Sequence, residues 1–182
     1  MITHCGTKEI HTARLLLRKF RREDAEAIFH GWTGDERVAK YTSWSAHTDV
    51  GMTEGYVDYI LSQDTERSYN WMIECEGKPI GSINVCWLDD NAGIAGVAYC
   101  LAYDSWGNGY ATEALRAVIE LLFEIGYRKI IAGCDAENTG SRRVLEKVGM
   151  KQEGCLRKMI LRKDGSFGDD LQFGLFKDEF IR

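Results

Sequence analysis

The sequence predicts an α+β fold with one mixed β-sheet, and three observations support this prediction. Apolar and polar residues alternate between Tyr69 and Trp87, which is the period of half-buried strands. Apolar residues recur every three or four positions between Ala25 and Trp32 and again between Ala111 and Ile125, which is the period of amphipathic helices. A nearly continuous apolar run from Ile94 to Tyr103 contains no charged residue, as expected of a strand buried on both faces.

The first third of the chain is predicted to contain one strand and two helices. The strand spans Arg14 to Phe20, and the apolar stripe from Ala25 to Trp32 follows it as a helix. A second helix is predicted from about Asp49 to Gln63. Thr48 or Asp49 is its expected N-cap, because a short polar side chain there can accept hydrogen bonds from the first free N–H groups.

The middle of the chain is predicted to form a β-hairpin and the central strand. Glu76 to Pro79 is a turn sequence between alternating segments that contain Ile73 and Ile83. Asp89 to Asn91 makes the next turn and leads into the run from Ile94 to Tyr103, which we expect at the middle of the sheet.

The second half of the chain is predicted to alternate helices with strands. Gly149 suits the left-handed backbone conformation that often follows the end of a helix. The predicted elements are a helix from about Ala111 to Ile125, a strand from Arg128 to Cys134, a short helix from Ser141 to Val148, and strands from Gln152 to Leu161 and from Leu171 to Phe176 across a turn at Asp164-Gly165.

Length and composition predict one domain that spans residues 1–182. Hydrophobic residues make up 45% of the chain and charged residues 28%, which is typical of a folded domain. The only proline is Pro79, and no Gly/Ser-rich stretch separates two parts. The net charge is −5 and no run of five basic residues occurs, so we expect no nucleic-acid partner.

Signals for membranes and metals are also missing from the sequence. The first residues lack a basic start followed by an apolar stretch, and no apolar run reaches 18 residues. We therefore expect no membrane partner and a cytoplasmic location. The six cysteines form no C-x-x-C motif and lie near no pair of histidines, so we expect no metal.

A glycine-rich turn, Trp106-Gly-Asn-Gly-Tyr-Ala-Thr112, lies between the predicted central strand and the following helix. The first N–H groups of that helix and the positive end of its dipole point out of the turn, which favours an anion. Gly107 and Gly109 carry no Cβ, so ligand phosphates could approach their amides closely. The turn therefore predicts a pyrophosphate site, although a strand-to-helix connection without a ligand has the same pattern.

Two other phosphate-binding motifs fit this turn less well. A P-loop needs a Gly-Lys-Ser/Thr sequence, which is absent. A dinucleotide-binding turn has a third glycine where this chain has Thr112, and an acidic residue about 20 residues further on. Asp135 ends the following strand at roughly that spacing, so a dinucleotide-binding oxidoreductase stays open as an alternative.

Several motifs, in a fixed order, extend along almost the whole chain. They are Thr12-Ala-Arg-Leu-Leu-Leu-Arg18 followed by Asp24-Ala-Glu-Ala, then Ile80-Gly-Ser, Trp106-Gly-Asn-Gly-Tyr-Ala-Thr-Glu-Ala114, and Asn138-Thr-Gly-Ser-Arg-Arg-Val-Leu-Glu-Lys-Val-Gly-Met150. With these motifs the chain resembles the GNAT superfamily of N-acetyltransferases, and within it the RimJ/RimL-like branch of ribosomal-protein N-terminal acetyltransferases. The coenzyme signature of the superfamily begins with Gln or Arg, and Trp106 at that position is a departure that this branch tolerates.

The resemblance implies a fold, a co-substrate and a reaction. The implied fold is a central mixed, mostly antiparallel sheet that is flanked by helices and splayed between its central strands. The implied co-substrate is acetyl-coenzyme A (acetyl-CoA) without a metal, and the implied reaction is direct attack of a primary amine on the thioester. A non-catalytic acyl-CoA-binding regulatory module stays open as the alternative function, and a homodimer stays open as the assembly.

The resemblance also implies roles for individual residues. The coenzyme's pyrophosphate is expected to bind the signature segment: Trp106, Gly107, Asn108, Gly109, Tyr110, Ala111 and Thr112. The strand edge that ends near Leu101 would pair with the pantetheine arm, and the Leu101 N–H would stabilise the oxyanion.

The second signature supplies the remaining candidates. Asn138 is implied as a pantetheine contact, Ser141 as the group that protonates the leaving thiolate, and Arg143 as a contact to a phosphate or adenine of the coenzyme. Local alternatives stay open, because Asn138 or Ser141 could simply cap the short helix and Arg143 could be solvated.

A general base is missing at the expected place. Relatives often carry a glutamate two residues before a Gly-Tyr pair that aligns with Ala98-Tyr99, and this chain has Gly96 there. An α-amine with a pKa near 8 is partly neutral at pH 7, whereas deprotonating a lysine costs about 4.6 kcal/mol. The expected acceptor is therefore a peptide or protein N-terminal α-amine, or a small-molecule amine of low pKa. Water or a group such as Glu74 would take its proton, although Glu74 is equally a surface strand residue.

Overall fold

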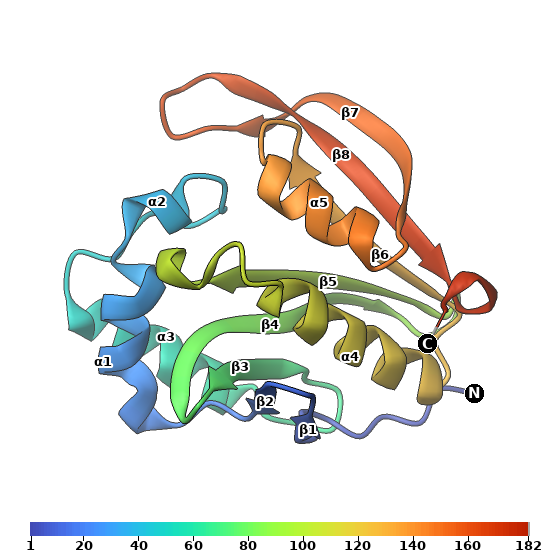
Figure 1. Ribbon diagram of the computed structural model, residues 1–182, viewed down its shortest axis with the longest axis horizontal. Helices are drawn as coiled ribbons and strands as arrows, with labels where there is room; N and C mark the ends of the chain where they lie inside the picture. Colours follow the sequence, from blue (N-terminus) through green and yellow to red (C-terminus); the bar gives the residue numbers. More distant parts are fainter. Residues whose placement is uncertain (182) are drawn as a thin grey trace.

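In the computed structural model, which describes residues 1–181, eight strands form one sheet in the order β1-β2-β3-β4-β5-β6-β8-β7 (Figure 1). The strands are β1 (Ile10–His11), β2 (Leu15–Arg18), β3 (Asn70–Cys75), β4 (Lys78–Asp89), β5 (Ile94–Leu101), β6 (Lys129–Asp135), β7 (Lys151–Leu161) and β8 (Phe167–Phe176). Neighbouring strands are antiparallel except for β5 and β6, which are parallel. This confirms the predicted mixed, mostly antiparallel sheet. It excludes the dinucleotide-binding alternative, which requires a mostly parallel sheet.

Within residues 1–181, five α-helices cover parts of the two faces. They are α1 (Ala25–Ile28), α2 (Glu36–Ala39), α3 (Val50–Ser62), α4 (Tyr110–Glu124) and α5 (Thr139–Lys147). The buried side of α4 and α5 packs with residues of β5, β6 and β8 in one core, which includes Leu115, Leu145 and Phe173. A second, smaller core lies under α1 and α3 and includes Trp32, Val57 and Met72. The sheet therefore separates two helical layers.

The N-terminal elements largely follow the prediction. The buried stripe from Ala25 to Trp32 is present, but α1 continues as a π-helical turn over Phe29–Thr33. Asp49 is the N-cap of α3, and its side chain accepts a hydrogen bond from the N–H of Met52 at 3.1 Å. The short helix α2 was not predicted, because it has only four residues and no repeating apolar pattern.

The sheet opens between its two parallel strands. The β5 and β6 pairing covers only three positions, from Ile94 opposite Lys129 to Gly96 opposite Ile131. Beyond Gly96 and Ile131 the strands separate, and α4 and α5 begin on the same side of the opening (Figure 1). This confirms the splay that the family resemblance implies and leaves one edge of β5 without a neighbouring strand over its last residues.

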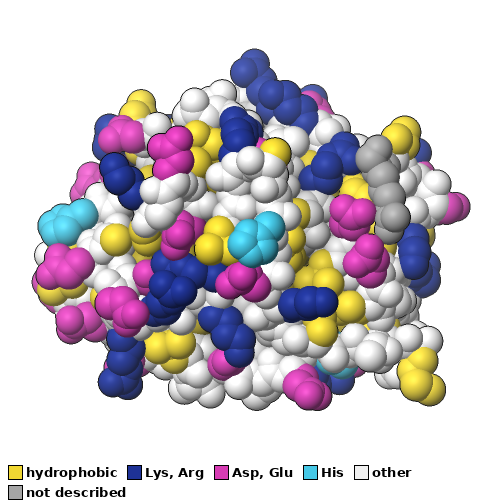
Figure 2. Space-filling view, turned by 60° about the horizontal axis from the view of Figure 1, so that its bottom comes forward, with side chains coloured by type: hydrophobic (Ala, Val, Ile, Leu, Met, Phe, Trp, Pro, Cys, Tyr) yellow, Lys and Arg dark blue, Asp and Glu magenta, His cyan; other side chains and the backbone are white. Residues whose placement is uncertain are grey.

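The surface and the helices give two further findings. Basic and acidic side chains are interspersed over the face shown in Figure 2, with no large area of one sign. Among residues 1–181, no helix combines the length and apolar character needed to cross a membrane.

Candidate active site

The glycine-rich turn is an exposed loop that leads into α4. Gly107 and Gly109 have φ angles of 78° and 80°, which residues with a Cβ rarely adopt. A Cβ at Gly107 would meet no protein atom within 4 Å, so backbone conformation and not packing requires glycine there. Gly109 is the N-cap of α4 and provides no side-chain cap, which leaves the N–H groups of Tyr110 to Thr112 directed out of the helix end. The Asn108 side chain donates to the carbonyls of Ser105 and Trp106 at 3.3 and 3.1 Å and so folds back onto the turn.

An ion pair joins the β1–β2 connection to the first turn of α4. The carboxylate of Glu113 accepts hydrogen bonds from the Thr12 hydroxyl at 2.6 Å and from the Arg14 Nε at 2.7 Å. Arg14 also donates to the carbonyl of Asn108 at 3.0 Å, and its guanidinium lies 4.6 Å from the centre of the Tyr110 ring. Burial raises the pKa of Glu113, but the hydrogen bonds from Thr12 and Arg14 outweigh burial and hold the pKa below its ordinary value. Glu113 is an ionised anchor for the helix end.

Trp106 fixes the end of β5. Its indole N–H donates to the carbonyl of Leu101 at 2.8 Å, and its ring centre lies 4.9 Å from that of Tyr103. The N–H of Ala102 donates to Ile80 in β4, so the N–H of the preceding residue, Leu101, points to the opposite edge of the strand. That edge faces the opening between β5 and β6. The tryptophan that replaces Gln or Arg in the signature thus orients the Leu101 peptide.

Ser141 contacts a tyrosine across the opening. Its hydroxyl oxygen lies 2.9 Å from the Tyr99 hydroxyl, which also lies 3.2 Å from the Ser141 carbonyl. Burial raises the pKa of Tyr99, so the phenol is protonated at neutral pH. The nearby Cys134 thiol contacts Ser141, and burial raises the pKa of this thiol to about 11. Neutral hydroxyl groups therefore surround the position implied for the leaving sulfur.

Asn138 and Arg143 take different positions at the start of α5. The Asn138 Oδ1 accepts a hydrogen bond from the Ser141 N–H at 3.1 Å, so Asn138 caps this helix. Its amide NH₂ group has no hydrogen bond to another residue in the described range 1–181, and a ligand could use it. Arg143 is exposed, and no ion pair involves it within residues 1–181, whereas its neighbour Arg142 pairs with Glu146 at 2.8 Å.

Gly96, where the resemblance would place the acid, is crowded, and Glu74 is held by an arginine. A Cβ at Gly96 would lie 3.3 Å from the Cβ of Trp87, so the position is too crowded for a glutamate unless its neighbours move. Glu74 accepts a hydrogen bond from Arg18 Nε at 2.7 Å, and Arg18 pairs with the buried Asp24 at 2.8 Å. β4 separates β3 from β5, which puts their axes about 10 Å apart. Glu74 is held in a structural ion pair away from the opening. This argues against the hypothesis that Glu74 acts as the general base.

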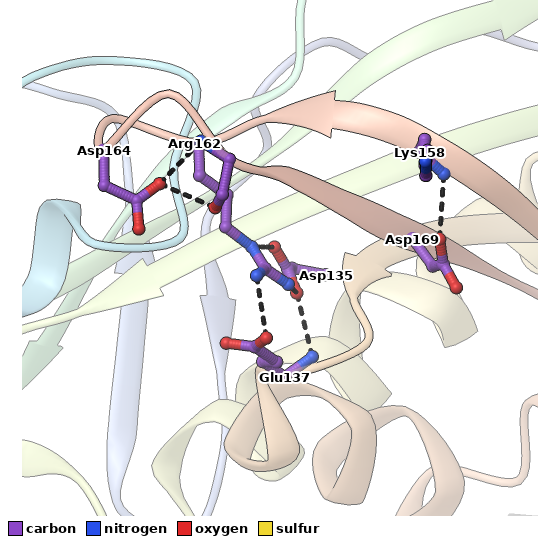
Figure 3. Close-up of polar contacts among 7 residues, drawn as sticks. Asp135, Glu137, Lys158, Arg162, Asp164 and Asp169 are labelled. Atoms are coloured by element: carbon purple, nitrogen blue, oxygen red, sulfur yellow. Dashed lines mark hydrogen bonds and ion pairs between the residues drawn. The ribbon is translucent and has the colours of Figure 1, made fainter.

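Two contacts near the opening were missed by sequence reasoning. Tyr99 is the hydroxyl partner of Ser141, and a polar group inside an apolar run could have indicated that it needs a partner. Arg162 in the β7–β8 turn reaches Asp135 at 2.8 Å and Glu137 at 2.7 Å (Figure 3). No local pattern joins Arg162 to residues so far away in the sequence.

Comparisons with known proteins agree with this geometry. The family model described as Acetyltransferase (GNAT) domain matches residues 14–151. The protein named Uncharacterized N-acetyltransferase p20, from Bacillus licheniformis, is 30% identical over 175 residues, which cover 94% of this chain and 97% of the relative.

Solved structures share the fold. The GNAT-family acetyltransferase from Bacillus anthracis is 29% identical with a TM-score of 0.83, and the match covers 94% of this chain and 100% of that one. RimL, described as a ribosomal L7/L12 alpha-N-protein acetyltransferase in complex with coenzyme A, has a TM-score of 0.85 at 18% identity, with 94% and 99% covered.

Proposed function

The chain belongs to the GNAT acetyltransferase family and is an N-acetyltransferase that uses acetyl-CoA, and from this premise we propose that it acetylates a peptide or protein N-terminal α-amine or a small-molecule amine of low pKa. The observation that carries the proposal is the pairing of an exposed helix N-terminus with an open strand edge. The first suits a pyrophosphate and the second suits an extended amide-containing arm.

The turn supplies the anion site. The N–H groups of Tyr110 to Thr112 are directed out of the uncapped end of α4, and the acid next to them, Glu113, is already paired with Arg14. Charge-assisted hydrogen bonds to such amides contribute about 1.5 to 3 kcal/mol each. Arg143 on α5 is exposed and available to a further phosphate or to adenine. Together these groups favour the diphosphate end of the coenzyme.

The opening between β5 and β6 supplies the reaction groups. The pantetheine arm would lie along the free edge of β5, where Asn138 offers its amide N–H groups from the start of α5. The Leu101 N–H, on a residue only 6% exposed, would stabilise the developing oxyanion in a setting that excludes water. Ser141 would protonate the thiolate while Tyr99 donates to the Ser141 oxygen in turn.

The class of acceptor follows from the side chains that could act as a general base. Gly96 leaves the usual position for the acid empty, and Glu74 is occupied by Arg18. An amine with a pKa near 8 requires far less help than a lysine near 10.4. The fold shared with RimL, and the resemblance of the motifs to the RimJ/RimL-like branch, favour a protein N-terminal α-amine within that class.

Thiol release in a panel of acceptors tests the proposal. The panel contains peptides with a free α-amine and blocked lysines, the same peptides with a blocked α-amine and free lysines, and small amines of graded pKa. We expect release at pH 7 with low-pKa amines and at least a 10-fold lower rate with lysines. Efficient, pH-insensitive lysine acetylation near neutrality would contradict the acceptor class. Stabilisation by coenzyme without thiol release from any amine would contradict the function.

A further inference from the structure

The face of the sheet opposite α4 and α5 carries a pair of acids on β6, which borders the opening, and on its neighbour β8. β6 and β8 pair without a register shift, and Asp135 lies directly opposite Asp170. The alternate residues Cys134 and Leu171 are buried in the core with α4 and α5. Successive side chains of a strand point to opposite faces, so Asp135 and Asp170 both project from the face away from these helices.

The charge of Asp135 is already neutralised. Its two carboxylate oxygens accept hydrogen bonds from Nε and Nη2 of Arg162, each at 2.8 Å, and the side chain of Asp135 is 1% exposed (Figure 3). The Arg162 hydrogen bonds hold the pKa of Asp135 below its ordinary value. Asp135 therefore stays ionised and occupied.

Asp170 differs from Asp135 in its partner and in the direction of its pKa shift. Its carboxylate accepts a hydrogen bond from the side-chain amide of Gln172 at 2.7 Å, and no ion pair to it is found within residues 1–181. Burial raises its pKa, the Gln172 bond offsets part of this, and the charge of Asp135 raises the pKa further. A half-buried carboxylate without a cation destabilises the folded state when it ionises, so a structural role does not explain it.

A glycine makes room for this carboxylate at the opening. Gly133 lies two residues beyond Ile131, the last residue of β6 that pairs with β5. A Cβ at Gly133 would lie 2.9 Å from the Asp170 Oδ1, which is closer than a side chain permits. The charge of Asp170 also raises the pKa of the Cys134 thiol, and this thiol contacts Ser141 on the face that carries α4 and α5. Asp170 and Ser141 therefore lie on opposite faces of the sheet, and only β6, which has no side chain at Gly133, stands between Asp170 and the opening.

We propose that Asp170 is the catalytic base, which receives the proton of the acceptor's ammonium group, directly or through one water, on the face opposite α4 and α5. This inference rests on the proposed function and names the group that the empty position at Gly96 leaves unassigned. It also fixes the direction of approach, because the acceptor enters from the Asp170 face while the coenzyme enters from the Ser141 face.

The protons and electrons of the step balance. The Asp170 carboxylate takes one proton from R–NH₃⁺, which frees the nitrogen electron pair. That pair forms the N–C bond to the acetyl carbon, and the electrons of the breaking C–S bond leave on sulfur. The second nitrogen proton passes to water, Ser141 gives its proton to the thiolate and regains one from solvent through Tyr99, and Asp170 releases its proton to water. The net products are the amide, the free thiol and one proton.

The charged and titratable neighbours define the pH behaviour. From β6 they are Asp135 and the Cys134 thiol, from the β7–β8 turn Arg162, and from the end of α2 Lys40, whose charge acts on Asp135. As the pH falls from neutral, Cys134 stays protonated and Asp135 stays paired. Burial and the charge of Asp135 raise the pKa of Asp170 above its ordinary value, so we assign the acid limb of the profile to this carboxylate.

The test compares kcat/KM from pH 5.5 to 9 for wild type, Asp170→Asn and Asp170→Glu, with the best α-amine acceptor. The wild type is expected to be flat between the pKa of Asp170 and that of the amine. Asp170→Asn must use amine that is already neutral, so its kcat/KM should rise tenfold per pH unit. We expect a deficit of about 100-fold at pH 6.5 that shrinks to a few-fold near pH 9. Asp170→Glu should recover part of the flat region.

Two controls separate catalysis from structure. Glu153→Gln removes an acid that contacts Gly174, on the same face at the far end of β8, and should keep the wild-type profile. Asp170→Asn should bind coenzyme A within about 2-fold of wild type and melt at the same or a higher temperature. A wild-type pH profile for Asp170→Asn, or a pH-independent loss with a lower melting temperature, would overturn the role of Asp170. A wild type that binds acetyl-CoA and acetylates no amine instead contradicts the proposed function itself, and with it this role.

Discussion

The two sides of the opening between β5 and β6 are formed by different kinds of chemical group. On the α4 side, the candidate coenzyme site consists of backbone N–H groups from one continuous segment, Gly107 to Thr112. On the opposite face, the candidate acceptor site consists of side chains from separate strands, with Asp170 in β8 beside Gly133 in β6. The first side depends on backbone conformation, and the second depends on strand register.

This difference has a consequence for electrostatics. The coenzyme side offers partial positive charge from N–H dipoles, and the acid in the first turn of α4, Glu113, is neutralised by Arg14. On the acceptor side, the Asp170 carboxylate has no ion pair within residues 1–181, and burial raises its pKa. An anionic coenzyme and a cationic amine are thus each met by the opposite sign of charge, on opposite faces of the sheet.

The largest expected effect comes from blocking the turn. In Gly109→Trp a bulky residue must adopt a φ of 80° at the helix N-terminus, where it covers the outward N–H groups. Loss of two charge-assisted hydrogen bonds predicts about 1,000-fold weaker binding of coenzyme A, measured by calorimetry.

Gly165→Trp is the matched control for this substitution. Gly165 has a φ of 82° in the β7–β8 turn and a Cβ there would meet no protein atom within 4 Å, whereas a Cβ at Gly109 would lie 3.5 Å from the Arg14 guanidinium, an ordinary van der Waals distance. The backbone strain is therefore comparable, but the position lies outside the glycine turn. Equal loss of coenzyme affinity in both variants would show that strain, and not the helix N-terminus, governs binding.

An intermediate effect is expected from Ser141 and Tyr99, which lie at the opening where the coenzyme side and the acceptor side meet. Ser141→Ala removes the proton donor to the thiolate, and we expect kcat to fall by about 100-fold while coenzyme affinity changes little. Tyr99→Phe should cause a smaller loss, because Ser141 keeps its own proton but loses the hydroxyl that replenishes it. Single-turnover kinetics with direct measurement of coenzyme binding separates the two quantities. Wild-type kcat in Ser141→Ala would remove Ser141 from the chemistry.

The same contrast explains how much the sequence could predict. The turn, the helix after it and the apolar strand before it were predictable, because glycine spacing and apolar periodicity are local signals. The absence of an acid at Gly96 was also predictable from the motif. The pairing of Asp135 with Arg162 was not, because it depends on the β7–β8 hairpin folding back over β6. Glu74 was suggested as a base because its ion pair with Arg18, 56 residues away, leaves no local signal.

The smallest expected effect concerns the ion pair that distinguishes Asp135 from Asp170. Arg162→Gln leaves a buried carboxylate without its cation, and because the Arg162 side chain is 19% exposed we expect a loss of about 2 kcal/mol in unfolding free energy at pH 7. Arg142→Gln breaks an exposed pair with Glu146 and should cost below about 0.5 kcal/mol in the same urea titration.

The pH dependence of this loss tests its electrostatic origin. Arg162 lowers the folded-state pKa of Asp135, so the stabilisation is present above the unfolded-state pKa of about 3.9 and disappears as the pH falls through the folded value. The difference between wild type and Arg162→Gln should therefore shrink below about pH 4, and an equal difference at pH 7 and pH 3 would assign it to packing. The unpaired charge of Asp135 should also raise the pKa of Asp170, because that charge already acts in this direction. The acid limb of kcat/KM would then move to higher pH while coenzyme affinity stays unchanged, since the Arg162 pair lies on the acceptor side alone.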